Sequence, residues 1–364
     1  MTAATTIAGS SGPDTAGAAT DSPGVQVIAA VDRHRRRRTL AVLTVLTGLV
    51  LTVAWASLSW GGQAGAVLDY AATLAGGGEG SGDFRIGTLR LPRLLLGGLV
   101  GIAFGIAGAL FQSVLGNSLA SPDILGVSGG GSLAAAFAII VLGLSGPVVG
   151  LAAFLGAATV AAAIYLLAWR SGVAGYRFVL IGVGIAFAIN AGIGYLLTRS
   201  DVTDVRSALV WMVGSIGTPR WPQVFTLAVI VAALIPLAVI ACQGLRALQL
   251  GDELAGGLGV RVEPARLLTL GVAVALAAGA TAFAGPVAFV AFVSAPIARR
   301  LLPGGGLAIG ASALVGALVV LGAELVSQHL IPSLELPVGI ITGAVGAPYL
   351  LWLLATSDAR EGSV

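Results

Sequence analysis

Only 10% of the 364 residues are charged and 57% are hydrophobic, whereas about 25% of the residues of an ordinary soluble domain are charged. At a mean hydropathy of +0.99, the chain has more apolar side chains than a water-soluble core can bury, so its apolar solvent is lipid. Long unbroken apolar runs exclude the alternating pattern of a β-barrel and predict an all-α membrane protein.

The 19 basic residues are all Arg, and the lack of Lys excludes a Walker A phosphate loop, which needs Gly-Lys-Ser/Thr. We therefore expect this chain to bind no cofactor, and any ATP to be bound by a partner chain. The single Cys, Cys242, cannot form an internal disulfide. Neither His34 nor His329 has a neighbour at metal-ligand spacing, so we predict no metal site. The net charge of +3 comes largely from one Arg cluster and gives little support for nucleic-acid binding.

The chain opens with residues 1–32, which are rich in Ala, Thr, Gly and Ser and lack apolar periodicity. With the basic cluster Arg33–Arg38, they predict a disordered cytoplasmic tail over residues 1–38. An apolar run from Thr39 to Trp60 follows. A basic cluster before an apolar run is also typical of a signal peptide, but this run exceeds the usual signal core of about 7–15 residues. We therefore favour an uncleaved first membrane span.

Nine further apolar runs approach the ~20 residues that cross a bilayer. They lie near residues 91–113, 123–143, 147–169, 178–198, 223–243, 266–283, 286–302, 307–329 and 337–355. We therefore expect about ten transmembrane helices in one domain over residues 39–356, and a cytoplasmic tail over 357–364. The stretch 206–217 is too short to span and predicts a partial helix outside. The polar segment 246–265 predicts a cytoplasmic loop with short helical pieces.

The Arg residues indicate how these spans are oriented. If the N-terminus is cytoplasmic and the spans alternate, thirteen of the 19 Arg residues fall inside and six fall outside. This bias follows the positive-inside rule, so we expect a multi-pass protein with both termini in the cytoplasm.

The motif Arg90-Leu91-Pro92-Arg93 opens the second predicted span. Four glycines follow it at helical spacing: Gly97, Gly101, Gly105 and Gly108. They place a flat stripe on one helix face, which predicts a close helix crossing. Arg90 and Arg93 lie at the outer end, where they either anchor the helix at the interface or face an acidic partner.

A second motif begins after Gln112 and runs from Asn117 to Gly131. Three consecutive glycines in it, from Gly129 to Gly131, weaken a helix by about 1 kcal/mol each relative to Ala. Such a cost inside a span indicates a broken helix, a cavity wall or a close helix contact.

This second motif resembles the FecCD family of ABC permeases, which includes importers of vitamin B12, haem and ferric siderophores. The resemblance covers about residues 40–355. It continues in order through Trp211–Ser215, Leu250–Glu253, Ala255, Leu258–Val260, Ala284–Val290, Ile297–Arg300, Leu336–Ile340 and Gly346–Pro348.

The resemblance implies a type II ABC importer permease fold in a bacterial cell membrane, and a transporter subunit rather than an enzyme. It implies ATP-driven alternating access that moves an iron chelate into the cytoplasm. Its implied partners are a second FecCD-type permease, two ATP-binding subunits and an extracytoplasmic substrate-binding protein.

The resemblance also implies functional residues. Coupling to the ATP-binding subunits is expected at Gly251, Asp252, Glu253, Ala255, Leu258 and Gly259. Docking of the binding protein is expected at Arg90, Arg93 and Gln328. For the translocation path we select Asn117, Ser128, Gly129 and Gly130.

Two departures from the family pattern bear on the cargo. Ala295-Pro296 stands where the family often has Pro-His or Pro-Gln, and Gln328 follows Glu324 where the vitamin B12 permease has Arg. Gln328 is similar to the catecholate siderophore permeases, which work as heterodimers. We therefore predict a ferric siderophore as cargo, with vitamin B12 or haem as the alternative.

Other classes of protein fit the spans less well. A secondary transporter driven by an ion gradient usually places several ionisable residues near the midplane. The predicted spans nearly lack them, although Glu324 lies within a span and leaves a proton-relay role open. An intramembrane enzyme would need a His, Asp or Ser constellation that we do not find.

Overall fold

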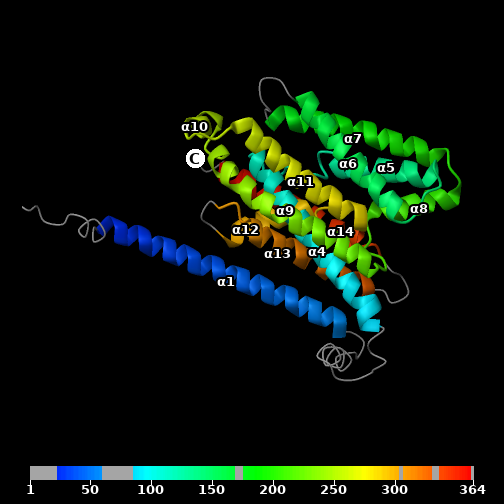
Figure 1. Ribbon diagram of the computed structural model, residues 1–364, viewed down its shortest axis with the longest axis horizontal. Coiled ribbons are helices and arrows are strands. Elements are labelled where there is room, and N and C mark those ends of the chain that lie inside the picture. The colour runs from blue at the N-terminus through cyan, green and yellow to red at the C-terminus, as the bar shows by residue number, and fades with distance from the viewer. Residues whose placement is uncertain (1–22, 60–84, 169–174, 303–305, 330–335, 362–364) are drawn as a thin grey trace, which may run out of the picture.

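The computed structural model describes residues 23–59, 85–168, 175–302, 306–329 and 336–361, which form helices and the turns that join them (Figure 1). The first half contains α1 (Pro23–Ser59), the π-helix η1 (Arg85–Arg90), α4 (Leu91–Val114), α5 (Val127–Ile140), α6 (Pro147–Ala168) and α7 (Gly175–Thr198). The second half contains α8 (Val202–Val213), α9 (Trp221–Leu248), α10 (Asp252–Gly257), α11 (Val262–Ala284), α12 (Val290–Leu301), α13 (Ile309–His329) and α14 (Val338–Glu361).

The all-α membrane fold is confirmed, and a helix stands at each of the ten predicted spans. Among the described residues, seven helices are long and apolar enough to cross a membrane, namely α1, α4, α6, α7, α9, α11 and α13. Helices α5 and α14 provide shorter apolar segments. Helix α12 has 12 residues, which at 1.5 Å each give about 18 Å, less than the ~30 Å hydrocarbon layer.

Helices α5 and α12 are shorter than predicted because the segment before each is not helical. Gly126 precedes α5 with φ 82°, and Phe289 precedes α12 with φ 65°, so neither residue can extend its helix backwards. Irregular backbone at membrane depth is tolerated only where protein or a water-filled cavity surrounds it. Leu125 and Val287, one in each segment, are accordingly fully buried.

The predicted tails differ from the structure. Helix α1 begins at Pro23, so residues 23–38 are helical rather than disordered, because Ala and Arg favour helix. Residues 1–22 lie outside the described part. Helix α14 continues to Glu361, so residues 357–361 of the expected C-terminal tail are helical too. Residues 362–364 lie outside the described part. The loop expected over residues 246–265 is also shorter, because α9 extends to Leu248 and α11 begins at Val262. Residues 249–261 connect the two helices and contain the short helix α10.

Helix α4 has the largest buried share of the seven candidate spans, and its glycine stripe explains this position. A Cβ atom on Gly101 would lie 2.4 Å from the carbonyl oxygen of Gly316 in α13. One on Gly108 would lie 1.8 Å from the carbonyl oxygen of Ala291 in α12. Real Cβ atoms do not approach so closely, so the helix backbones touch. The crossing that the glycine spacing predicts is confirmed.

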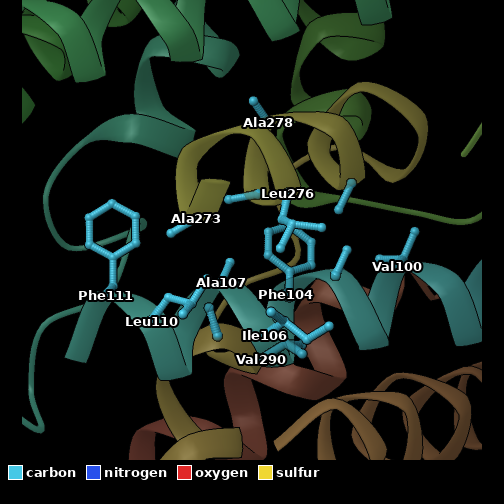
Figure 2. Packing of buried hydrophobic residues seen from close by; sticks show 14 of the residues in the cluster. Val100, Phe104, Ile106, Ala107, Leu110, Phe111, Ala273, Leu276, Ala278 and Val290 are labelled. Carbon is cyan, nitrogen blue, oxygen red and sulfur yellow. The ribbon is translucent and has the colours of Figure 1, made fainter. Parts of the chain in front are cut away.

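Another face of α4 is packed with large side chains. Figure 2 shows Phe104 of α4 next to Leu276 of α11, and both side chains are buried. Helix α4 thus meets α13 by backbone contact and α11 by side-chain packing.

The two ends of the bundle carry different elements. Helix α10 and the beginning of α1 lie toward one end, on the left in Figure 1, and η1 and α8 lie toward the other. We name these the inner and outer ends, following the orientation expected from the Arg residues. Helix α1 runs along the edge of the bundle, where Leu46 packs near Ala311 and Val315 of α13.

We expect Gly101→Ala to destabilise the protein and Gly98→Ala, on the same helix, to leave its stability unchanged or raised. The added methyl at position 101 overlaps the α13 backbone and costs about 1–3 kcal/mol as overpacking. At position 98 the nearest atom is 4.0 Å away, so the higher helix propensity of Ala can contribute up to about 1 kcal/mol. Thermal unfolding in detergent measures both. Equal Tm values for the two variants would contradict the backbone contact.

Candidate functional site

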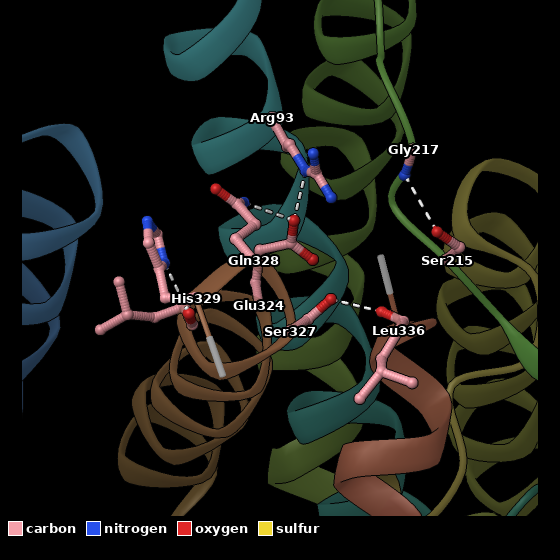
Figure 3. A network of polar contacts seen from close by, with 9 residues as sticks. Arg93, Ser215, Gly217, Glu324, Ser327, Gln328, His329 and Leu336 are labelled. Carbon is pink, nitrogen blue, oxygen red and sulfur yellow. Dashed lines mark hydrogen bonds and ion pairs between the residues drawn. The ribbon is translucent and has the colours of Figure 1, made fainter. Parts of the chain in front are cut away.

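A buried ion pair joins α4 and α13 at the outer end (Figure 3). Arg93 Nε donates a hydrogen bond to Glu324 Oε1, and Gln328 Nε2 donates to the same oxygen at 2.7 Å. The Glu324 side chain is 3% exposed and that of Arg93 is 16% exposed. Glu324 Oε2 is buried and has no hydrogen-bond partner among the described residues. The carboxylate charge is therefore balanced within the chain, which is what a buried charge requires.

This arrangement brings together two predicted docking residues, Arg93 and Gln328, but both point at Glu324. Glu324 stood out in the sequence as a carboxylate within a span, but its pairing with Arg93 was not predicted, because the two residues are 231 positions apart. The available signal was a carboxylate and an arginine, each near the outer end of a predicted span. The ion pair gives Glu324 a structural role, and docking by Arg93 and Gln328 stays a prediction.

Arg90, the third predicted docking residue, contacts α1. Its Nη1 donates a hydrogen bond to the carbonyl oxygen of Leu58 at 2.6 Å. The last carbonyls of a helix lack intrahelical donors and attract cations. The contact therefore supports the interpretation of Arg90 as an anchor and leaves docking untested.

At the inner end, Arg299 of α12 donates hydrogen bonds to the last turns of α4. It donates to Gln112 Oε1 and Ser113 Oγ, both at 3.1 Å, and to the carbonyl oxygen of Ala109 at 3.5 Å. Gln112 Nε2 in turn donates to the carbonyl oxygen of Phe292 at 3.0 Å. A cation is favoured at a helix C-terminus, so Arg299 stabilises the end of α4 without a carboxylate. Sequence analysis did not identify this contact.

The predicted coupling segment is held to α11 by charge. Asp252 accepts hydrogen bonds of 2.9 and 3.1 Å from Arg266 Nη2, and Glu263 lies 3.4 Å from Arg266 Nη1. Arg266 is buried whereas Asp252 is largely exposed. The contact therefore fixes the start of α10 against the body of the protein.

Helix α10 and the residues next to it expose apolar side chains at the inner end. Ala255 is fully buried, whereas Leu250, Leu254 and Leu258, spaced four residues apart, are 58–67% exposed. Glu253 is exposed as well. We call the three leucines the coupling surface. Of the three leucines, only Leu258 is a predicted coupling residue, although their four-residue spacing is visible in the sequence.

Gly251 and Gly259 lie on either side of α10, with φ angles of 100° and 83°. L-residues with side chains rarely adopt such angles, so glycine is needed at both turns. The structure thus gives these two predicted coupling residues a conformational role.

A cleft of about 690 Å³ lies beside the coupling segment. Its lining includes Gln112, Asn117, Gly251, Arg266 and Arg299. The cleft therefore brings the predicted path residue Asn117 next to the beginning of the coupling segment.

The other three predicted path residues lie apart from Asn117, at the start of α5. Ser128 Oγ donates to Asp123 Oδ1, Gly129 faces Ile189 of α7, and a Cβ on Gly130 would lie 2.8 Å from a backbone oxygen of α6. Helix α5 is continuous through these glycines. Of the three interpretations of the glycine run, the structure supports close helix contact, and a path role stays a prediction.

Three distant sequence motifs meet at one junction. Gly339 N donates to the carbonyl oxygen of Gly214 at 3.1 Å, and Ser215 N donates to that of Ala284 at 2.7 Å. A Cβ on Gly339 would lie 1.8 Å from the Val213 carbonyl oxygen. The motifs that end α8, end α11 and begin α14 thus share close backbone packing.

Metal-binding side chains do not cluster in the described part of the chain. No group of three or more His, Cys, Asp or Glu residues there could hold a metal ion.

Comparison with known proteins shows which family has this sequence and fold. The model described as the FecCD transport family matches residues 42–356. The chain belongs to the FecCD transport family. This match confirms the family predicted from the motifs. A FecCD permease is the membrane subunit of an ABC transporter and not an enzyme.

Among curated relatives, this FecCD chain is 36% identical over 306 residues to the ferric enterobactin transport system permease protein of Escherichia coli (strain K12). The match covers 83% of this chain and 93% of the relative. This chain is also 42% identical over 269 residues to the achromobactin transport system permease protein of Dickeya dadantii (strain 3937). That match covers 73% of this chain and 77% of the relative.

A solved structure described as an inward-facing metal-chelate type ABC transporter shares the fold. Its TM-score is 0.75 at 24% identity, covering 87% of this FecCD chain and 99% of that one.

For the outer ion pair, we expect Arg93→Gln and Glu324→Gln each to lower the free energy of unfolding by about 3 kcal/mol, because each leaves one charge unpaired and buried. The double variant should recover most of this loss, because it removes both charges. Unfolding of all four proteins in detergent gives the coupling energy. A double variant as unstable as the sum of the single variants would show that the pair is not coupled.

Proposed function

We propose that this FecCD permease is a transmembrane subunit of an ABC importer that moves a ferric siderophore into the cytoplasm by ATP-driven alternating access. The observation that carries the proposal is its similarity, over most of its length, to permeases for ferric enterobactin and achromobactin. On this proposal the chain supplies a path and docking surfaces, and partner chains bind the ATP.

The coupling surface supports a docking site for an ATP-binding subunit. Leu250, Leu254 and Leu258 expose apolar side chains in one short segment at the inner end, and exposed apolar side chains that gather in a patch mark interaction sites. The Arg266–Asp252 contact would let a force on α10 reach α11 directly. The absence of Lys supports nucleotide binding by that partner, since a Walker A loop requires Lys.

The outer cluster supports a docking site for an extracytoplasmic substrate-binding protein. Arg90 and Arg93 place two cations at the outer end, where an acidic partner would be attracted. Glu324 already balances the charge of Arg93 within the chain. Since Gln328 adds no charge, we propose an asymmetric dimer in which a related permease supplies the other half of the docking surface.

Haem is the second candidate cargo. The chain is 33% identical over 291 residues to the hemin transport system permease protein of Yersinia pestis. Vitamin B12 remains an alternative through the family resemblance alone.

To test coupling, we expect Leu254→Asp to abolish co-purification of the ATP-binding subunit, because a charge replaces an exposed apolar contact. The matched control is Val202→Asp at the start of α8, where the side chain is 84% exposed at the outer end. It should bind the ATP-binding subunit normally. If both variants bound the ATP-binding subunit equally well, the coupling surface would not be its docking site.

To test the cargo, we expect deletion of the gene to abolish growth on a ferric siderophore as sole iron source. Uptake of labelled haem and vitamin B12 should be unchanged, and the intact gene should restore growth. Loss of haem or vitamin B12 uptake with normal ferric-siderophore uptake would reassign the cargo.

A further inference from the structure

A large groove opens at the inner end between α1, α9 and α13. Its volume is about 1350 Å³. It is lined by the beginning of α1, the end of α9 and the beginning of α13. The beginning of α1 lies at the same end of the bundle as α10 (Figure 1). The groove is separate from the cleft beside the coupling segment, although Gln249 and Gly306 border both.

The groove is strongly basic. Its basic lining comprises His34, Arg35 and Arg38 from α1 and Arg246 from α9, and Cys242 of α9 lines it too. Neither Asp nor Glu occurs among the described lining residues. Within the described part of the chain, no carboxylate lies within 4.0 Å of a nitrogen of these three Arg side chains. Three cations on two helices thus face one space without a counter-ion.

The depth of the groove corresponds to the lipid headgroups. The apolar part of α1 runs from Thr39 to Ser59, which at 1.5 Å per residue is about 31 Å of helix and matches the ~30 Å hydrocarbon layer. The turns of α1 that precede it, with Arg35 and Arg38, therefore extend into the interface. Arg246 lies two residues before the end of α9, which places its charge at the same boundary.

Apolar side chains line the groove as well. Val31, Leu302, Leu307 and Ile309 line it beside the cations. Along α1, large side chains such as Leu40 remain exposed, because α1 packs on the bundle mainly through α13. The groove therefore combines a cationic rim with an apolar wall, and the exposed apolar side chains of α1 begin next to it.

We propose that this groove binds an anionic phospholipid, with the phosphate between Arg35, Arg38 and Arg246 and the acyl chains along α1. Basic pockets between membrane helices on the cytoplasmic side are suited to such headgroups. A free phosphate would use the cations but not the apolar wall. The bound lipid would fix the beginning of α1, which the protein itself holds by few contacts, against α9 and α13.

The chain supplies its own control for the test. Arg36 and Arg37 lie on the same turns of α1 and are exposed, but they do not line the groove. Arg35→Gln/Arg38→Gln and Arg36→Gln/Arg37→Gln therefore remove the same charge from the same helix, on different faces. Arg246→Gln tests the second wall of the groove from another helix.

The purified full-length chain, in detergent, is incubated with equal amounts of phosphatidylglycerol and phosphatidylcholine that carry the same acyl chains. Native mass spectrometry measures which lipid stays bound. We expect the wild type to retain phosphatidylglycerol in preference. The preference should fall by about tenfold or more in Arg35→Gln/Arg38→Gln, fall in Arg246→Gln, and persist in Arg36→Gln/Arg37→Gln.

Three results would overturn the proposal. An equal loss in the Arg36→Gln/Arg37→Gln control would show diffuse attraction to the basic helix rather than a site. Displacement of the lipid by millimolar inorganic phosphate would indicate a small-anion site. Displacement by the ATP-binding subunit would assign the groove to that protein. Because the assay needs neither ATP nor cargo, its outcome is independent of the transport proposal.

Discussion

Contact between the backbones of α4, α12 and α13 is the constraint on which the rest of the structure depends. In lipid, the hydrophobic effect does not drive helices together, so association relies on close packing and polar contacts. Glycines of α4 remove the side chains that would hold the helices apart, and the carbonyl oxygens of Gly316 and Ala291 fill the space. Any displacement of α4 along this face would separate these surfaces.

Polar contacts secure both ends of this crossing. Arg93 and Glu324 join α4 to α13 at the outer end, and Arg299 joins α4 to α12 at the inner end. Helix α4 therefore connects the end where a binding protein would dock with the end that carries the cleft and the coupling surface. A rigid connection of this kind would be needed for docking outside and ATP binding inside to influence the same path.

The inner end is divided between two kinds of surface. The coupling surface on α10 is apolar and is held by the Arg266–Asp252 contact, which suits a rigid protein partner. The groove beside α1 is basic and borders a helix with few contacts to the bundle, which suits an adaptable lipid. Leu250 borders both surfaces, whereas the Arg side chains line only the groove, so the two surfaces are neighbours of different chemistry, which favours different occupants.

The sequence by itself determined the membrane class, the positions of ten helices and the family, because apolar run length and ordered motifs are local properties of the chain. It also determined the close crossing of α4, because the spacing of Gly101, Gly105 and Gly108 is visible along one helix. Only the tertiary structure paired Arg93 with Glu324 and Arg299 with Gln112, because these partners are far apart in the chain and periodicity carries no information about distant contacts. The same reason explains why α5 and α12 were predicted too long: the turns at Gly126 and Phe289 lie within apolar sequence, and only packing around them sets where each helix begins.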